Sequence, residues 1–310
     1  MSAADPATAW RRLLRLFGTA RFIREGIRAR LLERIHPWQR ESRGEFRVPF
    51  WGYDYVGHFD DAQDYMVYFR GGYENPELHL LAGIAGEVDG CISFDIGAST
   101  GQHMLVLSSR SARVFAFEPF PEVREIACSR LAHNAIGNVE LLPFGLGTED
   151  NELEYHWDSS NSNRMAGSFV ASHANLGVYG KLEVRNGDRW AADAGVTRVD
   201  LIKLDVEGFE ADVLLGIRRL LASQPFILME VSWTAFDKIE AAGGLSEVLP
   251  FEFDLYRVLS GRDALLFNFS DYKLERIAGI SRPSHWGYNV LVVPRGRPPL
   301  DAIRRHVRGR

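Results

Sequence analysis

The sequence is poor in cysteine and in long apolar runs. Only Cys91 and Cys128 occur among 310 residues. Both lie in apolar runs, so we expect two small buried side chains and no disulfide framework. No uninterrupted apolar run reaches about 18 residues, and the arginine-rich N-terminus lacks the apolar core of a secretory signal. These absences predict a cytoplasmic protein, because reducing compartments disfavour disulfides.

An excess of positive charge is also absent. The chain carries a net charge of -5, which argues against a general nucleic-acid binder. The charge is uneven, since Met1 to Val48 contains 11 Lys/Arg and 5 Asp/Glu, a local net of +6. With 46% apolar and 25% charged residues, the composition is that of a soluble globular protein, and we expect one large α/β domain with additions.

Two N-terminal segments have a distinctive pattern. Apolar residues from Trp10 to Ile35 recur at helical spacing between arginines, which predicts basic amphipathic helices. We expect their apolar face to pack on the domain, with contact to the inner face of a membrane as the alternative. From Phe50 to Tyr73, 9 of 24 residues are aromatic. They are a candidate wall for a sugar or similar acceptor, although packing is the more common role of such stripes.

The run Cys91 to Gly101, C-I-S-F-D-I-G-A-S-T-G, predicts a buried strand followed by a tight turn into a helix. Glycine in such a turn lets a ligand approach the backbone. The spacing Asp-x-Gly-x-x-x-Gly at Asp95, Gly97 and Gly101 differs from the Gly-x-Gly-x-x-Gly of dinucleotide sites.

Acids follow the other predicted strands. Ala112 to Phe117 ends at Glu118, 23 residues after Asp95, where a carboxylate can bind ribose hydroxyls. Val139 to Phe144 is a third strand, and Gly145 to Asp150 is predicted to be a loop on the same edge.

A second informative run, Val199 to Glu210, reads V-D-L-I-K-L-D-V-E-G-F-E. It predicts a buried parallel strand with Asp205 and Glu207 at its end, and Glu210 in the first turn of the next helix. The strand Phe226 to Met229 also ends in an acid, Glu230. Carboxyl ends of parallel strands share one sheet edge, so these acids predict a site for a cationic ligand.

The remaining chain offers weaker patterns. Asn151 to Asp193 is predicted to be an insertion, hairpin or lid. We expect a helix around Ala235 to Leu249, and then strands at Leu255 to Leu259, Ala264 to Phe269 and Tyr288 to Val293. We expect the basic segment from Pro294 to be poorly ordered.

These motifs together resemble the FkbM-type family of S-adenosylmethionine-dependent methyltransferases. The matching residues are D-I-G-A-S-T-G from Asp95, F-E-P-F-P from Phe117, His133 with Asn134, I-K-L-D-V-E-G-F-E from Ile202 and P-F-I-L-M-E-V from Pro225. The resemblance implies a class I, doubly wound α/β fold with seven mostly parallel strands in the order 3-2-1-4-5-7-6. The resemblance covers roughly Cys91 to Val231. We expect the methyltransferase domain at residues 78–294, after an extension at 1–77 and before a basic tail at 295–310.

The resemblance also implies roles for the site residues. Asp95, Gly97 and Gly101 would hold the methionine end of S-adenosylmethionine, Glu118 its ribose, and Phe120 would flank the adenine. The full expected cofactor set is Asp95, Gly97, Ala98, Ser99, Thr100, Gly101, Glu118, Pro119, Phe120, Gly145 and Asp205. The family typically O-methylates sugars and other hydroxyl groups, so the implied acceptor is a small molecule or a glycan, free or lipid-linked.

A hydroxyl acceptor is a weak nucleophile and needs a base as the new bond forms. We expect Asp205 or Glu207 to be that base, with Lys203, Glu230 and His285 as less favoured participants. A variant has Asp205, Glu207 and Glu230 holding a Mg²⁺ ion, although we favour a site without metal.

Two other classes of function remain as alternatives. An acid after the second strand also suits a NAD-dependent oxidoreductase, although the third glycine of Gly-x-Gly-x-x-Gly is missing. The basic N-terminus and the aromatic stripe would also suit a non-catalytic glycan-binding or membrane-associated protein. The acceptor and the oligomeric state are not specified by these residues.

Overall fold

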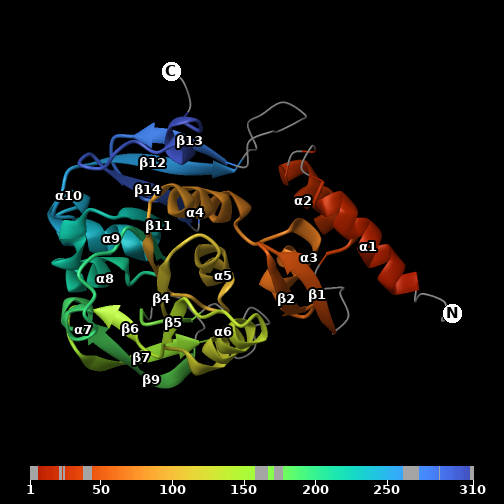
Figure 1. Ribbon diagram of the computed structural model, residues 1–310, viewed down its shortest axis with the longest axis horizontal. Helices are drawn as coiled ribbons and strands as arrows, with labels where there is room; N and C mark the ends of the chain where they lie inside the picture. The colour runs from red at the N-terminus through yellow and green to blue at the C-terminus, as the bar shows by residue number, and fades with distance from the viewer. Residues whose placement is uncertain are drawn as a thin grey trace.

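The computed structural model describes residues 6–20, 23, 25–37, 44–157, 167–170, 177–260, 272–285 and 287–307. An N-terminal unit lies at one end of the molecule's long axis, and a sheet with helices on both faces forms the rest (Figure 1). A smaller sheet lies beside the main one.

The central sheet is built from β3 Ile92–Ile96, β4 Arg113–Phe117, β5 Val139–Leu142, β10 Leu201–Leu204, β11 Phe226–Ser232, β12 Phe253–Ser260, β13 Tyr272–Ile277 and β14 Gly287–Pro294. Their order across the sheet is β13-β12-β14-β11-β10-β3-β4-β5. The neighbouring strands β5, β4, β3, β10 and β11 pair in parallel, whereas β14 pairs antiparallel with both β11 and β12. The mostly parallel sheet predicted from the sequence is therefore confirmed.

Helices cover both faces of this sheet. On one face, α7 Gly187–Asp193, α8 Glu210–Gly216, α9 Trp233–Ala241 and α10 Leu245–Val248 bury a core with Trp190, Leu214 and Ile239. On the other face lie α4 Asn75–Glu87, α5 Gln102–Ser108, α6 Pro121–His133 and α11 Asp301–Arg304. All four residues of β10 are buried, as expected for a strand covered on both faces.

Three details differ from the expectations. The sheet has eight strands, because β13 adds an edge strand whose alternating burial gives no continuous apolar run. The strand predicted at 264–269 lies outside the described residues. The helix predicted over 235–249 is divided into α9 and α10, since Gly243 and Gly244 have φ of +93° and +86°.

The segment from Gly145 to Asn186 forms a second sheet. Its strands are β6 Gly145–Gly147, β7 Asn151–Trp157, β8 Gly167–Ser168 and β9 Gly177–Asn186, in the order β6-β9-β7-β8. The predicted loop at 145–150 is thus wrong at its start, because Gly145 pairs in parallel with Val184. This pairing joins the insertion to the domain.

The N-terminal unit consists of α1 Pro6–Gly18, α2 Glu25–Ile35, β1 Glu45–Phe50, β2 Tyr53–His58 and α3 Ala62–Arg70. Its aromatic residues form a core, with Tyr55, Phe59 and Phe69 at most 3% exposed. The expectation that this stripe forms a substrate wall is therefore wrong for these residues, and packing explains them. Buried Arg130 of α6 fixes the unit in place, lying 2.7 Å from Asp64.

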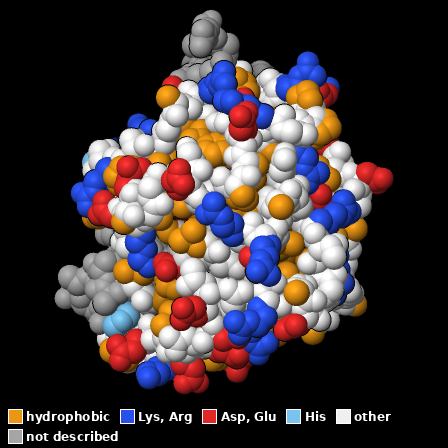
Figure 2. Space-filling view, turned by 90° about the vertical axis from the view of Figure 1, so that its left-hand side faces the viewer, with side chains coloured by type: hydrophobic (Ala, Val, Ile, Leu, Met, Phe, Trp, Pro, Cys, Tyr) orange, Lys and Arg blue, Asp and Glu red, His pale blue; other side chains and the backbone are white. Residues whose placement is uncertain are grey.

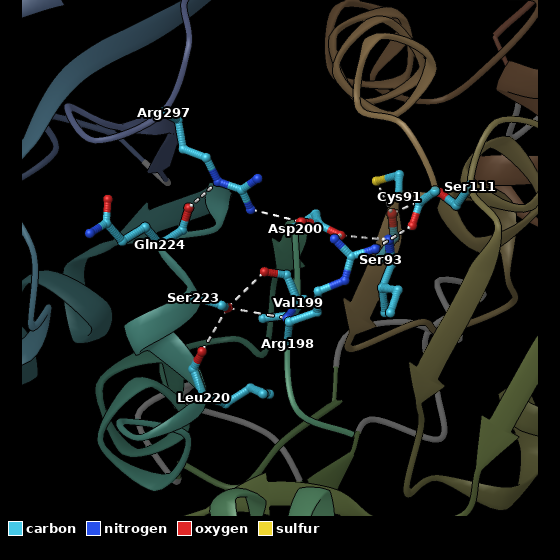
Figure 3. Close-up of polar contacts among 12 residues, drawn as sticks. Cys91, Ser93, Ser111, Arg198, Val199, Asp200, Leu220, Ser223, Gln224 and Arg297 are labelled. Atoms are coloured by element: carbon cyan, nitrogen blue, oxygen red, sulfur yellow. Dashed lines mark hydrogen bonds and ion pairs between the residues drawn. The ribbon is translucent and has the colours of Figure 1, made fainter. Parts of the chain in front are cut away.

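Residues 295–307 pack against the domain, contrary to expectation. Arg297 donates to the carboxylate of buried Asp200 at 2.8 Å and to the carbonyl of Gln224 (Figure 3). In α11, the amides of Asp301 and Ala302 donate to Glu87. These hydrogen bonds and ion pairs satisfy polar groups of the C-terminal segment that water would otherwise have to satisfy, so the segment is held on the domain.

The two cysteines differ in environment. Cys91 is buried beside Ser93, with its sulfur 3.5 Å from Oγ. Cys128 is exposed on α6, so its expected burial is wrong. The apolar residues around Cys128 face the other side of the helix, a difference that sequence proximity does not show.

Candidate active site

The main candidate site is a pocket at the carboxyl ends of β3, β4 and β10. Lining residues come from the glycine turn after β3, the end of β4, the loop after β10, the N-terminal unit and the second sheet. In an open α/β sheet this edge is where ligands bind. A pocket therefore lies at the sheet edge where the sequence predicts the site.

The two glycines of the turn serve chain packing. Gly97 has φ +83°, and a Cβ there would lie 1.8 Å from the carbonyl oxygen of Asp205. Gly101 has φ +89°, and its Cβ would lie 2.6 Å from Cε of Met104. Both positions therefore need glycine before any ligand is considered. Gly97 lines the pocket, whereas Gly101 lies outside its lining.

Glu118 is held in a fixed orientation at the end of β4. Its Oε2 accepts a hydrogen bond from the amide of Ser99 at 2.7 Å, and its Oε1 accepts one from the amide of Phe120 at 2.9 Å. Burial raises the pKa of Glu118 to about 7, although both amide bonds lower it. The carboxylate is thus oriented by backbone, with its remaining acceptor capacity toward the pocket that it lines.

Most of the expected cofactor residues meet at this pocket. Its lining includes Gly97, Ala98, Ser99, Glu118, Pro119, Gly145 and Asp205. Asp95 and Thr100 are buried behind the turn, and neither lines the pocket. Phe120 is also outside the lining, because its ring packs between Tyr155 and Trp157 at centroid distances of 5.2 and 5.3 Å. Its amide, rather than its ring, contributes through Glu118.

The opposite wall carries an ion pair from β10. Lys203 Nζ lies 3.2 Å from Oδ2 of Asp205 and donates to the carbonyl oxygen of Gly97 at 3.3 Å. Burial opposes the charge of Lys203, but Asp205, Asp95 and Glu74 raise its pKa above the ordinary value. Lys203 therefore stays protonated and cannot accept a proton.

Several carboxyl groups around this ion pair have raised pKa values. Burial, together with Asp205, raises the pKa of Glu207 to about 8 and that of Glu230 to about 9. The same two causes raise the pKa of Glu74 to about 7. Glu207 lines the pocket, whereas Glu230 and Glu74 lie behind the lining. One lysine does not neutralise this set, so the site has an unmet preference for positive charge.

Glu210 plays the structural part expected of it. Its Oε1 accepts hydrogen bonds from the amides of Val206 and Gly208 at 3.1 and 3.2 Å. It closes the loop that carries Glu207 before α8 begins. Glu207 itself has φ +53°, a left-handed conformation that side chains other than glycine rarely adopt. The local fold thus holds Glu207 at the pocket in a strained backbone.

Two other non-glycine residues with positive φ lie at this site. Ser99 has φ +51° in the glycine turn, and Glu74 has φ +54° just before α4. Strain of this kind persists where surrounding structure fixes the backbone, which is common at functional sites.

The sequence motifs did not indicate the pocket residues Gln63, Gln102 and His103, although Tyr73 lies in the predicted aromatic stripe. Gln63 and Tyr73 lie outside the sequence motifs and line the pocket, and Gln102 and His103 line it from α5. Gln102 joins the two parts, since its Nε2 donates to the carbonyl of Tyr73 and its Oε1 accepts from the Tyr73 amide. Only Tyr73 of the predicted aromatic wall reaches the pocket.

The second sheet supplies the remaining side. Tyr155, Ser168 and Phe169 line the pocket, so the predicted insertion does contribute to it. Ser168 Oγ donates to the carbonyl of Glu207 at 2.7 Å, and the ring of Phe169 lies 5.6 Å from that of Phe209. These contacts tie the insertion to the loop carrying the acids.

His285 is not brought into the pocket lining, and its side chain is exposed. No group of three or more His, Cys, Asp or Glu side chains among the described residues is arranged to hold a metal ion. The Mg²⁺ variant therefore gains no support from Asp205, Glu207 and Glu230. Within the same described part of the chain, no helix has the length and apolar character needed to cross a membrane.

The pocket is suited to a ligand that is part cation and part polyol. Buried Ser99 Oγ has no hydrogen-bond partner among the described residues and so remains available to a ligand. Glu118 presents oriented acceptor oxygens on one side, and the acids around Asp205 favour a positive charge on the other. These features fit the ribose and the sulfonium of S-adenosylmethionine.

Comparisons with known proteins identify the family of the chain. The model of the methyltransferase FkbM domain family matches residues 95–260, more than half of the chain. Hexuronic acid methyltransferase AglP of Haloferax volcanii is 29% identical over 163 residues, covering 51% of this chain and 62% of AglP. The 2-O-methyltransferase NoeI of Sinorhizobium fredii is 28% identical over 156 residues, covering 46% of this chain and 63% of NoeI. The chain thus spans less than two thirds of either relative.

Solved structures also show similarity. A S-adenosylmethionine-dependent methyltransferase from Agrobacterium tumefaciens matches with a TM-score of 0.45 and 11% identity, over 83% of this chain and 72% of that one. A rRNA methylase from Streptococcus thermophilus matches with a TM-score of 0.41 and 13% identity, over 70% of this chain and 93% of that one.

Proposed function

The chain belongs to the FkbM methyltransferase family, and from that premise we propose that it transfers a methyl group from S-adenosylmethionine to a hydroxyl group of a sugar or glycan. The carboxyl cluster with raised pKa values beside oriented Glu118 is the observation that carries this proposal. The printed names of AglP and NoeI, a hexuronic acid methyltransferase and a 2-O-methyltransferase, support a sugar hydroxyl as acceptor.

We assign the two sides of the pocket to the two ends of the cofactor. Glu118 and Pro119 would hold the nucleoside end, with Glu118 accepting from ribose hydroxyls. Gly97, Ala98 and Ser99 would hold the amino-acid end. S-adenosylmethionine supplies the methyl group on a sulfonium cation. Asp205, fixed by Lys203, would place negative charge near that cation.

Glu207 is the proposed base. It lines the pocket, and its pKa of about 8 is raised by burial and by Asp205, so it is poised near neutral pH for proton transfer. A positive charge beside the cluster lowers the pKa of Glu207 and so favours the carboxylate form. The carboxylate would take the proton of the acceptor hydroxyl as oxygen attacks carbon. Lys203 holds its proton throughout and serves to position Asp205.

We further propose that the domain at residues 78–294 works with two covers. The extension at 1–77 contributes Gln63 and Tyr73, and the insertion at 151–193 contributes Tyr155 and Phe169. Aromatic and amide side chains of this kind suit the apolar faces and hydroxyls of a sugar. Both covers exclude water from the base, which strengthens its electrostatic interactions.

Labelled methyl transfer tests the proposal. The full chain is incubated with methyl-labelled S-adenosylmethionine and a panel of free sugars, nucleotide sugars, lipid-linked glycans and polymeric glycans. We expect label on one acceptor class, at an oxygen located by mass spectrometry. Chemical blocking of that hydroxyl before the reaction should abolish the labelling, which would confirm the position. Transfer to nitrogen or carbon alone would contradict the assignment.

Cofactor identity is tested separately by calorimetry. The neutral product S-adenosylhomocysteine and the cation S-adenosylmethionine are compared as pH rises toward the pKa of Glu207. The affinity for the cation should rise as the cluster loses protons, while the affinity for the neutral compound should change little. Preferential binding of NAD would favour the oxidoreductase alternative instead.

A further inference from the structure

Helices α1 and α2 expose apolar side chains that no other described residue covers. These residues, here called the outer face, are Trp10, Leu13, Leu16, Leu31 and Ile35, which are 45%, 57%, 69%, 40% and 51% exposed. Among the described residues, only eight large apolar side chains are exposed to this degree, and these are five of them. Such a concentration on two helices that contact each other favours an interaction site.

The helices do not need the outer face in order to dock on the domain. Leu14 and Leu32 are buried in the core of the N-terminal unit, at 4% and 1% exposure. The guanidinium of Arg11 stacks over Phe59 at 4.3 Å, and that of Arg15 over Tyr68 at 5.7 Å. The expected packing of an apolar face is thus met by one side of the helices, and a second apolar side remains outside.

Arginines surround the outer face. Arg12, Arg30 and Arg34 are exposed on the same two helices, and residues 1–48 carry a net charge of +6 within a chain of -5. Figure 1 places α1 and α2 at one end of the long axis and α10 near the other. Figure 2 shows the face at the α10 end, where acidic and basic side chains are interspersed.

We propose that the outer face binds the surface of an anionic lipid bilayer. Leucine, isoleucine and tryptophan insert at the boundary between headgroups and acyl chains, while arginines remain among the phosphates. Tryptophan favours this boundary because its ring is apolar and its N–H is polar. A second copy of the chain is a poorer occupant, since a symmetric contact would bring the same arginines together.

Vesicle binding tests this inference without any methyl transfer. The full chain is sedimented with phosphatidylcholine vesicles that contain about 30 mol% phosphatidylglycerol, and with phosphatidylcholine alone. We expect binding to the anionic vesicles, weakened by salt. The double variant Leu13→Gln/Leu16→Gln, which keeps helix propensity, should bind about tenfold more weakly. The double variant Arg12→Glu/Arg34→Glu should lose binding to a similar degree.

The control variant makes the same change in net charge at arginines outside α1 and α2. Arg110→Glu/Arg304→Glu replaces two exposed arginines outside α1 and α2, and should bind as the unchanged protein does. Failure of the full chain to bind anionic vesicles would overturn the inference. The inference would also fail if both double variants in α1 and α2 bound vesicles as strongly as the unchanged protein. It would fail too if the chain bound no vesicles but formed a concentration-dependent dimer that those variants abolish. Failure of methyl transfer would leave this result unaffected.

Discussion

Two acids flank β10 and differ in their electrostatic state: Asp200 before the strand is buried, and Asp205 after it is 28% exposed. At the start of the strand, Asp200 is 1% exposed and fully partnered, accepting from the Ile92 amide at 3.0 Å and from Arg297 at 2.8 Å (Figure 3). At its end, Asp205 shares Lys203 with surrounding carboxyl groups. Burial raises the pKa of those groups, as for Glu207 and Glu230.

The difference separates an acid that is fully partnered within the chain from acids for which we propose a role in the site. The Asp200 end satisfies its charge within the chain, and Ser223 adds a cap by donating to the carbonyl of Val199 at 2.8 Å. At the Asp205 end, one lysine is shared among several carboxyl groups, and burial keeps Glu207 and Glu230 protonated near neutral pH. Ionising these two groups costs stability unless a ligand brings positive charge. Substitutions at the two ends should therefore affect different measurements.

Asp200→Ala should give the largest effect, on stability. It leaves the guanidinium of Arg297 and the amide of Ile92 without their buried partner, so we expect a loss of about 3 to 5 kcal/mol in the free energy of unfolding. Urea unfolding measures this loss. Asp254→Ala, which removes exposed pairs with Arg276 and Arg295, should cost about 1 kcal/mol or less. Equal effects of the two variants would refute the distinction.

Glu207→Gln should act on turnover. Removing the proposed base should lower turnover about a hundredfold on the acceptor identified by labelling, because general base catalysis contributes gains of that order. The melting temperature should stay the same or rise, since a neutral amide replaces a carboxyl group whose ionisation burial opposes. Unchanged turnover would remove Glu207 from this role and direct attention to Asp205.

Glu118→Gln should act on cofactor affinity. The amide can accept at only one atom, so it cannot keep both backbone bonds and also accept from ribose hydroxyls. We expect affinity for S-adenosylhomocysteine to fall about tenfold by calorimetry, which corresponds to one lost charged hydrogen bond. Glu122→Gln, at an exposed position in the same segment, is the matched control and should bind normally.

A last expected effect is a pH dependence of stability without ligand. The ordinary pKa of 4.5 is raised to about 8 in Glu207 and about 9 in Glu230, so the folded protein holds protons that the unfolded chain releases. Stability from these groups is full below pH 4.5 and is lost as pH rises through 8 and 9. Melting temperatures should fall over this range, and Glu230→Gln should make the fall shallower. An identical profile in that variant would show that Glu230 does not titrate as described.

Local pattern determined the central part of the fold and one half of the site. Buried strands covered on both faces leave continuous apolar runs, so β3, β4, β10 and β11 could be predicted from sequence. Parallel pairing then places the residues after each strand at one edge, which is why Glu118, Asp205 and Glu207 could be grouped in advance. The turn at Gly97 was also predictable; backbone packing requires its glycines, and Gly97 also lines the pocket.

Tertiary structure alone decided the other half of the site and the state of its charges. Gln63 and Tyr73 reach the pocket because Arg130 and Gln102 fix the N-terminal unit on the domain, and no local pattern encodes contacts at such separation. The sequence places Asp200 and Asp205 on either side of one predicted strand, but it does not show which residues pair with them. Arg297 reaches one end of β10 from the far end of the chain, whereas acids from four segments surround the other. Burial and distance, which only the folded chain sets, made one acid structural and the other available to a ligand.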